Sequence, residues 1–364
     1  MRNILFLIVI FSNTVNADAP WIAFWDEGKT LIGYKDATGA VRIEPRFGGF
    51  TTAYKFNNII AVMEEKNNRY LQYYLLKNGE QIEFDNVYIS DSSYDCESEQ
   101  TIRFRDNKSK KVGYLNHNGK IKIPAIYDNT TSFRNGLAVA IKNSTKMCFN
   151  KIEYSDANRC EHWYWEGGET VLINKDNAIL LTDFKNSTDL DFYSFNTSRF
   201  SSNKPYISSF ITSNGDYFTF VNIKKHFNNW LFNSLLTDLS INNLNRYSFD
   251  EIKYWGSDKK WGSADKGKFL KNNLNLLKAE LNLKINSDYI VLISGLNEYI
   301  YTGNEFKKYF NDCGDSKVMK YPVLDLVINK KLDGKNYQNS FEFLKTETSY
   351  KLISVTIRNS NLLQ

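Results

Sequence analysis

The stretch GYLNHNGKIKIPAIYDNTTSFRNGLAVAIKN, residues 113–143, decides the fold expected for the first half of the chain. Asn and Gly at 116–119 supply the positive φ angles of a tight turn, and apolar residues alternate with polar ones on either side. Pro124 has no N–H for a sheet ladder, so it is expected to end the second strand. The small apolar run at 137–141 then predicts a third strand, in which small residues allow close packing.

The same pattern recurs along the first half of the chain. GYKDATG at 33–39 and YYLLKNG at 73–79 precede GYLNHNG at 113–119, so Gly39, Gly79 and Gly119 recur every 40 residues. A fixed period of this length is typical of repeat proteins, in which one unit cannot bury its apolar face alone. A partial fourth copy, VLINKDNAIL, follows at 171–180.

This pattern resembles the WG β-repeat family, also called KWG repeats, over about residues 30–185. The third copy matches closely, with Tyr114 where the family most often has Trp, whereas the second copy departs from the pattern after Gly79. The resemblance implies stacked β-hairpin repeats that bind other molecules, without catalytic residues shared by the family. We therefore expect Tyr34, Tyr114 and Tyr127 to be exposed binding candidates.

Two literal Trp-Gly dipeptides, at 255–256 and 261–262, lie outside the repeats. Their surroundings show no strand–turn–strand pattern, so we expect a loop between helices with the Trp rings packed at its ends.

The first seventeen residues predict a secretory signal peptide. A positive start is followed by the apolar run ILFLIVIF at 4–11 and by small residues around Ala17, and the run is too short to span a bilayer. We expect a mature chain that is periplasmic or secreted and has no transmembrane segment.

Four cysteines are consistent with an oxidising compartment. Cys148 and Cys160 flank a short polar segment with strand-like arms, and a disulfide there would close a hairpin inserted into the repeats. A zinc site or free thiols are the alternatives, although zinc would need more ligands than His162 nearby. Cys96 and Cys313 are the remaining pair; Cys313 would act as a nucleophile only if it were reduced and activated.

The second half of the chain predicts an α+β domain. Apolar residues at helical spacing occupy 220–239 and 265–283, which predicts two long helices. A strand at 289–293, a short helix at 303–310 and three strands at 322–327, 340–344 and 350–357 predict a terminal antiparallel sheet. The order of elements and the stretch EYIYTGNEFKKYF resemble the NTF2-like α+β cone. We thus expect a repeat domain over 18–200 and an α+β domain over 205–364.

No catalytic, metal-binding or cofactor-binding motif is visible. The three histidines, His117, His162 and His226, are not at metal-ligand spacing, and paired acids such as Asp250 and Glu251 are typical of surface charges. A formal charge of +5 with interleaved signs does not indicate a nucleic-acid binder.

We therefore predict a non-enzymatic, exported binding protein that uses its repeat surface to hold a protein partner. An inhibitor or immunity-type protein against an exported toxin or hydrolase is one specific form of this function. Small-ligand binding or hydrolysis in the C-terminal domain is the first alternative, and a pocket with convergent polar groups would favour it. A structural role in the cell envelope is the second.

Overall fold

The computed structural model describes residues 19–90, 93–155, 157–185, 187–256, 260–284, 287–332, 334–358 and 362. The chain forms two compact units, one ending at Ile126 and the other beginning at Tyr127. The predicted signal peptide, 1–17, lies outside the described residues. No helix in the described part of the chain combines the length and the hydrophobicity needed to cross a bilayer.

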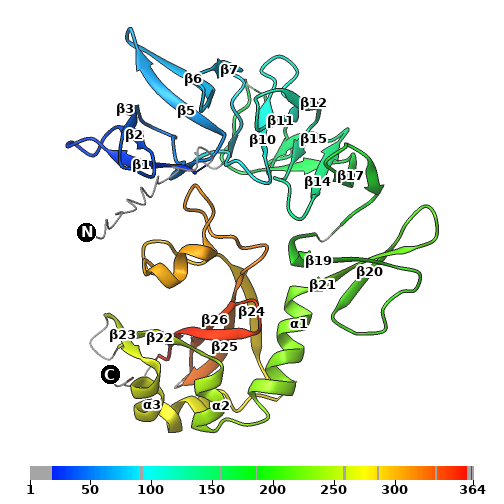
Figure 1. Cartoon of the computed structure of the whole chain (residues 1–364). Coiled ribbons are helices and arrows are strands. Elements are labelled where there is room, and N and C mark those ends of the chain that lie inside the picture. Colours follow the sequence, from blue (N-terminus) through cyan, green and yellow to red (C-terminus); the bar gives the residue numbers. More distant parts are fainter. Residues whose placement is uncertain are drawn as a thin grey trace, which may run out of the picture. The chain divides into compact units, whose positions relative to one another are not determined.

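The first unit consists of antiparallel sheets (Figure 1). Its seven-stranded sheet has the order β4-β1-β2-β3-β5-β6-β7, and its three-stranded sheet has the order β10-β11-β12. The strands are β1 Trp21–Trp25, β2 Ile32–Lys35, β3 Val41–Phe47, β4 Lys55–Phe56, β5 Ile59–Lys66, β6 Arg69–Leu76, β7 Gln81–Ile82, β8 Ile89–Ser90, β9 Ser93–Tyr94, β10 Thr101–Arg105, β11 Val112–Asn116 and β12 Ile121–Tyr127.

The turns of the repeats share one hydrogen-bond pattern. In the first copy the N–H of Asp36 donates to the carbonyl of Ala40 (3.0 Å), and Gly39, with φ +87°, donates back to the carbonyl of Asp36 (3.0 Å). The Asp36 carboxylate also accepts from the N–H groups of Thr38 and Ala40 and pairs with Arg42. Hydrogen bonds, that from the Thr38 hydroxyl foremost, hold the pKa of Asp36 at about 2.

The other copies repeat this turn. Asn116 accepts from the N–H groups of Asn118 and Lys120, and Gly119 has φ +73°. In the partial fourth copy Asn174 takes the place of Asn116, and Asn177, with φ +61°, takes the place of the glycine. Asparagine tolerates this left-handed conformation better than other non-glycine residues, which explains how the fourth copy keeps the turn without Gly.

In the first and third copies of the repeat, the first glycine allows two strands to approach each other closely. A Cβ on Gly33 would lie 2.5 Å from the carbonyl oxygen of Ile43 and 2.7 Å from the nitrogen of Pro45. A Cβ on Gly113 would likewise lie 2.5 Å from the carbonyl oxygen of Ile123. The Gly-Tyr pair therefore combines a residue without a side chain, where backbones cross, with a neighbouring large ring on the opposite face.

The prediction that proline ends the second strand is wrong. β3 and β12 continue through Pro45 and Pro124. In the first copy Tyr34 pairs with Ile43 and Ile32 pairs with Phe47, so Pro45 lies in a bulge. A bulge leaves residues outside the ladder, so the missing N–H of proline is tolerated there.

The second unit begins with the rest of the repeat region. A four-stranded sheet has the order β13-β14-β17-β18, a two-stranded sheet pairs β15 with β16, and a three-stranded sheet has the order β19-β21-β20. The elements are β13 Asn129–Thr130, β14 Leu137–Lys142, β15 Thr145–Cys148, β16 Trp163–Glu166, β17 Glu169–Asn174, β18 Ile179–Leu181, η1 Ser187–Asp189, β19 Leu190–Ser198, β20 Ile207–Ile211 and β21 Tyr217–Asn222.

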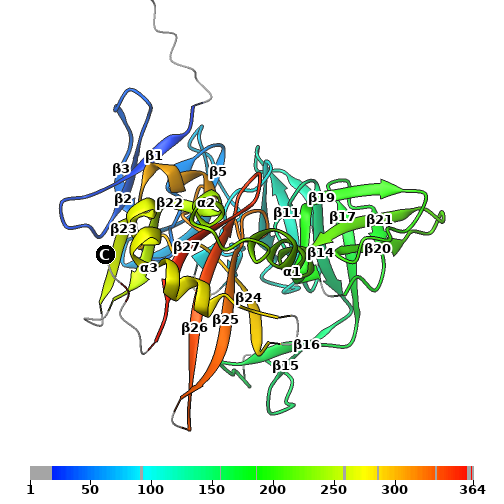
Figure 2. The same ribbon diagram turned by 90° about the horizontal axis from the view of Figure 1, so that it is seen from below.

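A six-stranded mixed sheet, ordered β23-β22-β27-β26-β25-β24, forms the rest of this unit, with α1, α2 and α3 packed on one face (Figures 1 and 2). β22 and β27 are parallel, and the other neighbouring pairs are antiparallel. The elements are α1 Ile223–Trp230, the π-helical turn η2 Leu231–Leu235, α2 Ile241–Arg246, β22 Ser248–Trp255, β23 Trp261–Asp265, α3 Lys266–Glu280, β24 Tyr289–Ser294, η3 Asn304–Tyr309, β25 Val323–Leu332, β26 Lys335–Lys345 and β27 Tyr350–Thr356.

The structure is mostly β, broadly within the α+β class, but the two long helices predicted here are absent. α1 has 8 residues before the backbone changes to the π-helical turn, and α3 has 15. The apolar stripe over 220–239 began in β21, where alternating residues of a strand mimicked helical spacing. The resemblance to an NTF2-like cone is not confirmed.

The loop predicted around the Trp-Gly dipeptides is also wrong. Trp255 ends β22 and Trp261 begins β23, and the two residues pair across a hairpin with their ring centroids 5.5 Å apart. The polar residues between the two dipeptides hide the strand pattern of the residues on either side.

The chain divides into two compact units at 126/127, and the domain boundary expected near 200–205 stays a prediction. Phe184 and Phe192 pack with Phe220 in one apolar cluster, and Lys345 of β26 pairs with Asp191 of β19 at 3.0 Å. These contacts join the later repeat strands to the C-terminal sheet. The first unit consequently ends inside the third copy.

We expect Gly33→Ala to destabilise the first unit by about 1–3 kcal/mol, because the added Cβ would overlap the backbone of β3. Gly28→Ala is the matched control, since its Cβ would meet nothing nearer than 3.6 Å. Urea unfolding followed by circular dichroism measures both variants. Equal midpoints for the two would show that the close approach is not a constraint.

Candidate functional site

The three tyrosines nominated from the sequence are not on the surface. Tyr34 and Tyr114 are 0% exposed and Tyr127 is 3% exposed. The Tyr34 hydroxyl donates to the carbonyl of Ala53 (2.9 Å), and the Tyr127 hydroxyl bonds the Asn177 side chain (2.7 Å). Burial raises the pKa of Tyr34 and Tyr127. The expectation that these rings are exposed is wrong, because the Gly-Tyr strands β2 and β11 direct Tyr34 and Tyr114 into the core and Tyr127 ends β12 at a buried position.

The described cysteines are all in disulfides. Cys148 and Cys160 are linked, with their Sγ atoms 2.01 Å apart. Cys96 and Cys313 are disulfide-bonded as well, so neither is a free nucleophile, and their pairing with each other stays a prediction.

The Cys148–Cys160 bond closes what we call the disulfide hairpin, residues 145–166, formed by β15, β16 and the segment between them. The main chain is held on both sides of the bond: the N–H of Cys148 donates to Ile152 (2.8 Å), and that of Phe149 donates to His162 (3.2 Å). The Lys146 ammonium lies 3.7 Å from the ring centre of Tyr154 and 3.9 Å from that of Trp163. Main-chain hydrogen bonds, ring contacts and the disulfide therefore hold the described residues of the hairpin in place.

The disulfide hairpin presents apolar side chains to solvent. Phe149 is 71% exposed, Ile152 is 48% exposed and Trp163 is 40% exposed. Phe149 also contacts the rings of His162 and Tyr164, which limits its motion. Exposed aromatic residues held on a rigid support are typical of the energetic centres of protein interfaces. The sequence carried a signal for them, namely aromatic residues between and beside two cysteines.

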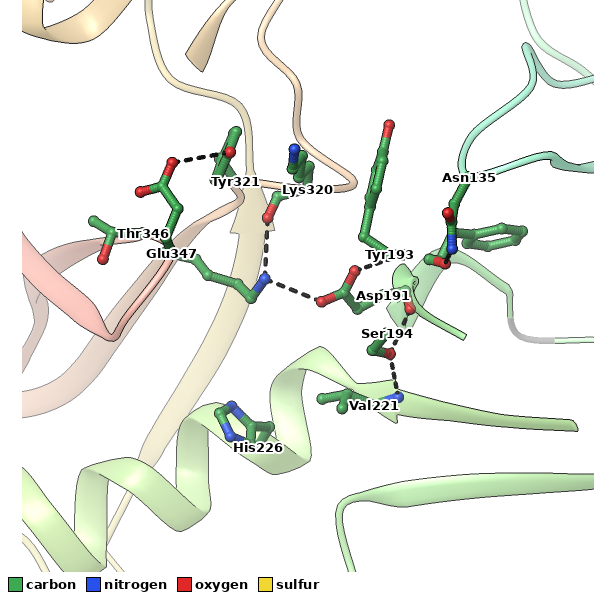
Figure 3. A network of polar contacts seen from close by, with 12 residues as sticks. Asn135, Asp191, Tyr193, Ser194, Val221, His226, Lys320, Tyr321, Thr346 and Glu347 are labelled. Atoms are coloured by element: carbon green, nitrogen blue, oxygen red, sulfur yellow. Dashed lines mark hydrogen bonds and ion pairs between the residues drawn. The ribbon is translucent and has the colours of Figure 1, made fainter. Parts of the chain in front are cut away.

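A polar network at the end of β26 lies near His226 (Figure 3). Lys345 donates to Asp191 and to the carbonyl of Lys320 (3.1 Å), and Asp191 accepts from the N–H of Tyr193 (2.9 Å). His226 lies close by on α1, with Nδ1 2.8 Å from the Tyr350 hydroxyl. Burial, aided by the charge of Lys345, lowers the pKa of His226. Its partners are core residues, so its role is to support the fold.

The C-terminal sheet carries a groove on the face opposite α1, α2 and α3. Two adjoining cavities of about 210 Å³ and 1030 Å³ share Trp261 and Glu342 in their linings. Asp325 and Glu342 lie on the floor of this sheet groove. Among the described residues no group of three His, Cys, Asp or Glu side chains is arranged to hold a metal ion. Each of these two acids stands alone between apolar residues of a strand, in Leu-Asp-Leu and in Phe-Glu-Phe. This pattern is the sequence signal from which the groove floor could have been predicted.

Comparison with known proteins bears on the repeat region. Residues 113–145 match the family model of the WG containing repeat. The chain contains a WG repeat. No curated protein and no solved structure shows significant similarity to the chain.

The disulfide hairpin begins where the match to the WG repeat ends. The match ends at residue 145, which is the first residue of β15. The hairpin leaves the sheet after β14 and the chain returns as β17, which pairs directly with β14. It is thus an addition to a repeat-based module of the kind that mediates protein interaction.

Replacing both Cys148 and Cys160 by serine should destabilise the second unit by about 3 kcal/mol, since the bond closes a short loop in the unfolded chain. Thermal unfolding under non-reducing conditions measures the loss, and an unchanged midpoint would contradict it. Peptide mapping without reduction checks the 148–160 link and tests the predicted pairing of Cys96 with Cys313.

His226 should titrate below its ordinary pKa of 6.5 in the folded protein. As the pH falls below 6.5, the unfolded chain takes up a proton that the folded chain resists, so the free energy of unfolding should decrease between pH 7 and pH 5. NMR titration of the imidazole Cε1 proton measures the pKa, and His226→Gln should reduce the pH dependence. A midpoint at or above 6.5 would contradict the burial argument.

Proposed function

We propose that the protein is an exported, non-enzymatic binding protein that holds a protein partner on its WG repeat region, with the disulfide hairpin as the main contact. The observation that carries this proposal is the exposure of Phe149, Ile152 and Trp163 on a covalently closed support. The loss of conformational entropy on binding is small for such a surface, because its side chains and main chain are held in place before binding.

Disulfides fit an exported protein, since they persist in the periplasm and outside the cell. An aromatic contact of this kind suits the blocking of another protein, in which one projecting side chain enters a cavity and its neighbours exclude water. We therefore extend the proposal to an inhibitor or immunity-type protein that caps an exported toxin or hydrolase.

A paired capture experiment tests the proposal. The chain from residue 18 and its Phe149→Ser/Trp163→Ser variant are immobilised with disulfides intact and incubated with envelope and culture fractions of the native host and its competitors. We expect one protein to be captured in stoichiometric amount by the wild type and reduced at least ~10-fold by the variant, a loss within the range of interface hot spots.

Tyr299→Ser is the matched control, because Tyr299 is 85% exposed and lies outside the hairpin. Equal capture by wild type, hairpin variant and control would contradict the proposal. The inhibitor function requires, in addition, that the captured protein lose its activity when the wild type is added at equal concentration.

Small-ligand binding in the C-terminal part of the chain is the second candidate function. The sheet groove supports it, since a concave site with a few converging polar groups is the usual form of a ligand site.

A further inference from the structure

The sheet groove lies on the face of the six-stranded sheet opposite α1, α2 and α3. The segment around η3 covers part of this face through an apolar cluster that includes Leu296, Tyr301, Phe306 and Ile353. Beside this cover, in the described part of the second unit, two cavities of about 210 Å³ and 1030 Å³ follow the face.

Sheet register brings polar residues together on the groove floor. Asp325 of β25 lies directly opposite Glu342 of β26, and Glu342 lies opposite Ser354 of β27. Ser354 in turn lies opposite Lys253 of β22. Residues directly opposite on antiparallel strands have Cβ atoms about 5 Å apart, so the two carboxyl groups are close neighbours.

In the part of the chain that the structure describes, the two carboxyl groups have hydroxyl-bearing neighbours and no cationic partner. Asp325 accepts a hydrogen bond from the Ser340 hydroxyl, and the uncharged Ser354 is the register partner of Glu342 on β27. Among the described residues neither acid lies within ion-pair distance of a lysine, arginine or histidine. Four cations line the two cavities: Lys253 pairs with Glu251, Lys330 pairs with Glu280 (3.0 Å), and Lys331 and Arg358 lie beside Lys330 on the lining of the larger cavity.

This arrangement is unfavourable without a ligand. Like charges directly opposite each other destabilise a sheet, and both groups are half-buried. Burial raises the pKa of Asp325, and burial together with the charge of Asp325 raises the pKa of Glu342. Acids with a perturbed pKa in a cleft are candidates for functional sites, and a cation bound between them would favour their charged form.

Apolar side chains border the floor. Ile290 and Leu292 of β24 are 45% and 47% exposed, and Trp261 of β23 is 55% exposed. Leu292 pairs directly with Asp325, which places it next to the acids. The indole of Trp261, supported by Trp255, offers an aromatic face of the type that attracts organic cations.

We propose that the sheet groove binds an organic cation, a primary ammonium or guanidinium group on an apolar chain, between Asp325 and Glu342. The apolar borders favour an organic cation over a metal ion, and the described residues provide no third acid, His or Cys ligand for a metal. The site is separate from the disulfide hairpin, so it does not depend on the proposed protein-binding function.

Titration of the chain from residue 18 with butylguanidinium, followed by amide NMR shifts and calorimetry, tests the site. We expect shifts in β25 and β26 and a dissociation constant of about 0.1–1 mM, as suits a small fragment. Asp325→Asn and Glu342→Gln should each weaken binding at least ~10-fold, and butanol should not bind. Glu27→Gln, an exposed acid of the first unit, should leave binding unchanged.

The same variants separate a ligand site from a structural pair. Because each removes a repulsive charge, we expect their thermal midpoints at pH 7 to equal or exceed that of the wild type. Should one of them fail to fold, Trp261→Ser at the exposed border replaces it and is expected to weaken binding.

A further arm identifies the source of the cation. Tighter binding of the peptide acetyl-Leu-Arg-Leu-amide than of butylguanidinium would assign the groove to a basic protein segment, and the reverse order to a free amine. No binding of either probe, binding unaffected by both acid variants, or competition by millimolar calcium chloride would overturn the proposal.

Discussion

The close crossing of two backbones at the repeat glycine constrains the whole first unit. At Gly33 and at Gly113 a neighbouring strand passes so near that even one methyl group would overlap it. The crossing puts the following tyrosine on the core side and requires a bulge in the partner strand, where proline is accepted. Turn, glycine and tyrosine therefore act as one unit in the first and third copies, 80 residues apart, whereas the second copy keeps the turn and has Tyr73 in place of the first glycine.

Features that depend on the local conformational preference of a residue could be predicted from the sequence. Positive φ angles at Gly39, Gly79 and Gly119 were predictable, as were the strand 137–141 and the link of Cys148 to Cys160. The WG repeat is confirmed by the match at 113–145. These features follow from local chemistry, so a single sequence is enough to find them.

Features that depend on tertiary contacts, such as the burial of a side chain or the register of two strands, could not be predicted from the sequence. Nothing local shows whether an aromatic residue of a strand faces core or solvent, so Tyr34, Tyr114 and Tyr127 were nominated although they are buried. The opposition of Asp325 and Glu342 depends on strand register between segments that no local pattern aligns. The π-helical turn after α1 and the ion pair of Asp191 with Lys345 likewise depend on packing at long range.

The disulfide hairpin departs from one strand and the chain rejoins the sheet at that strand's immediate neighbour. The register of β14 and β17 therefore does not depend on the 26 residues between them. The Cys148–Cys160 disulfide constrains the insertion separately from the sheet. A lineage carrying this module can exchange the aromatic residues, or the length, of the insertion while its scaffold stays unchanged. The exposed side chains of the insertion and the folding of its scaffold are thereby open to separate selection.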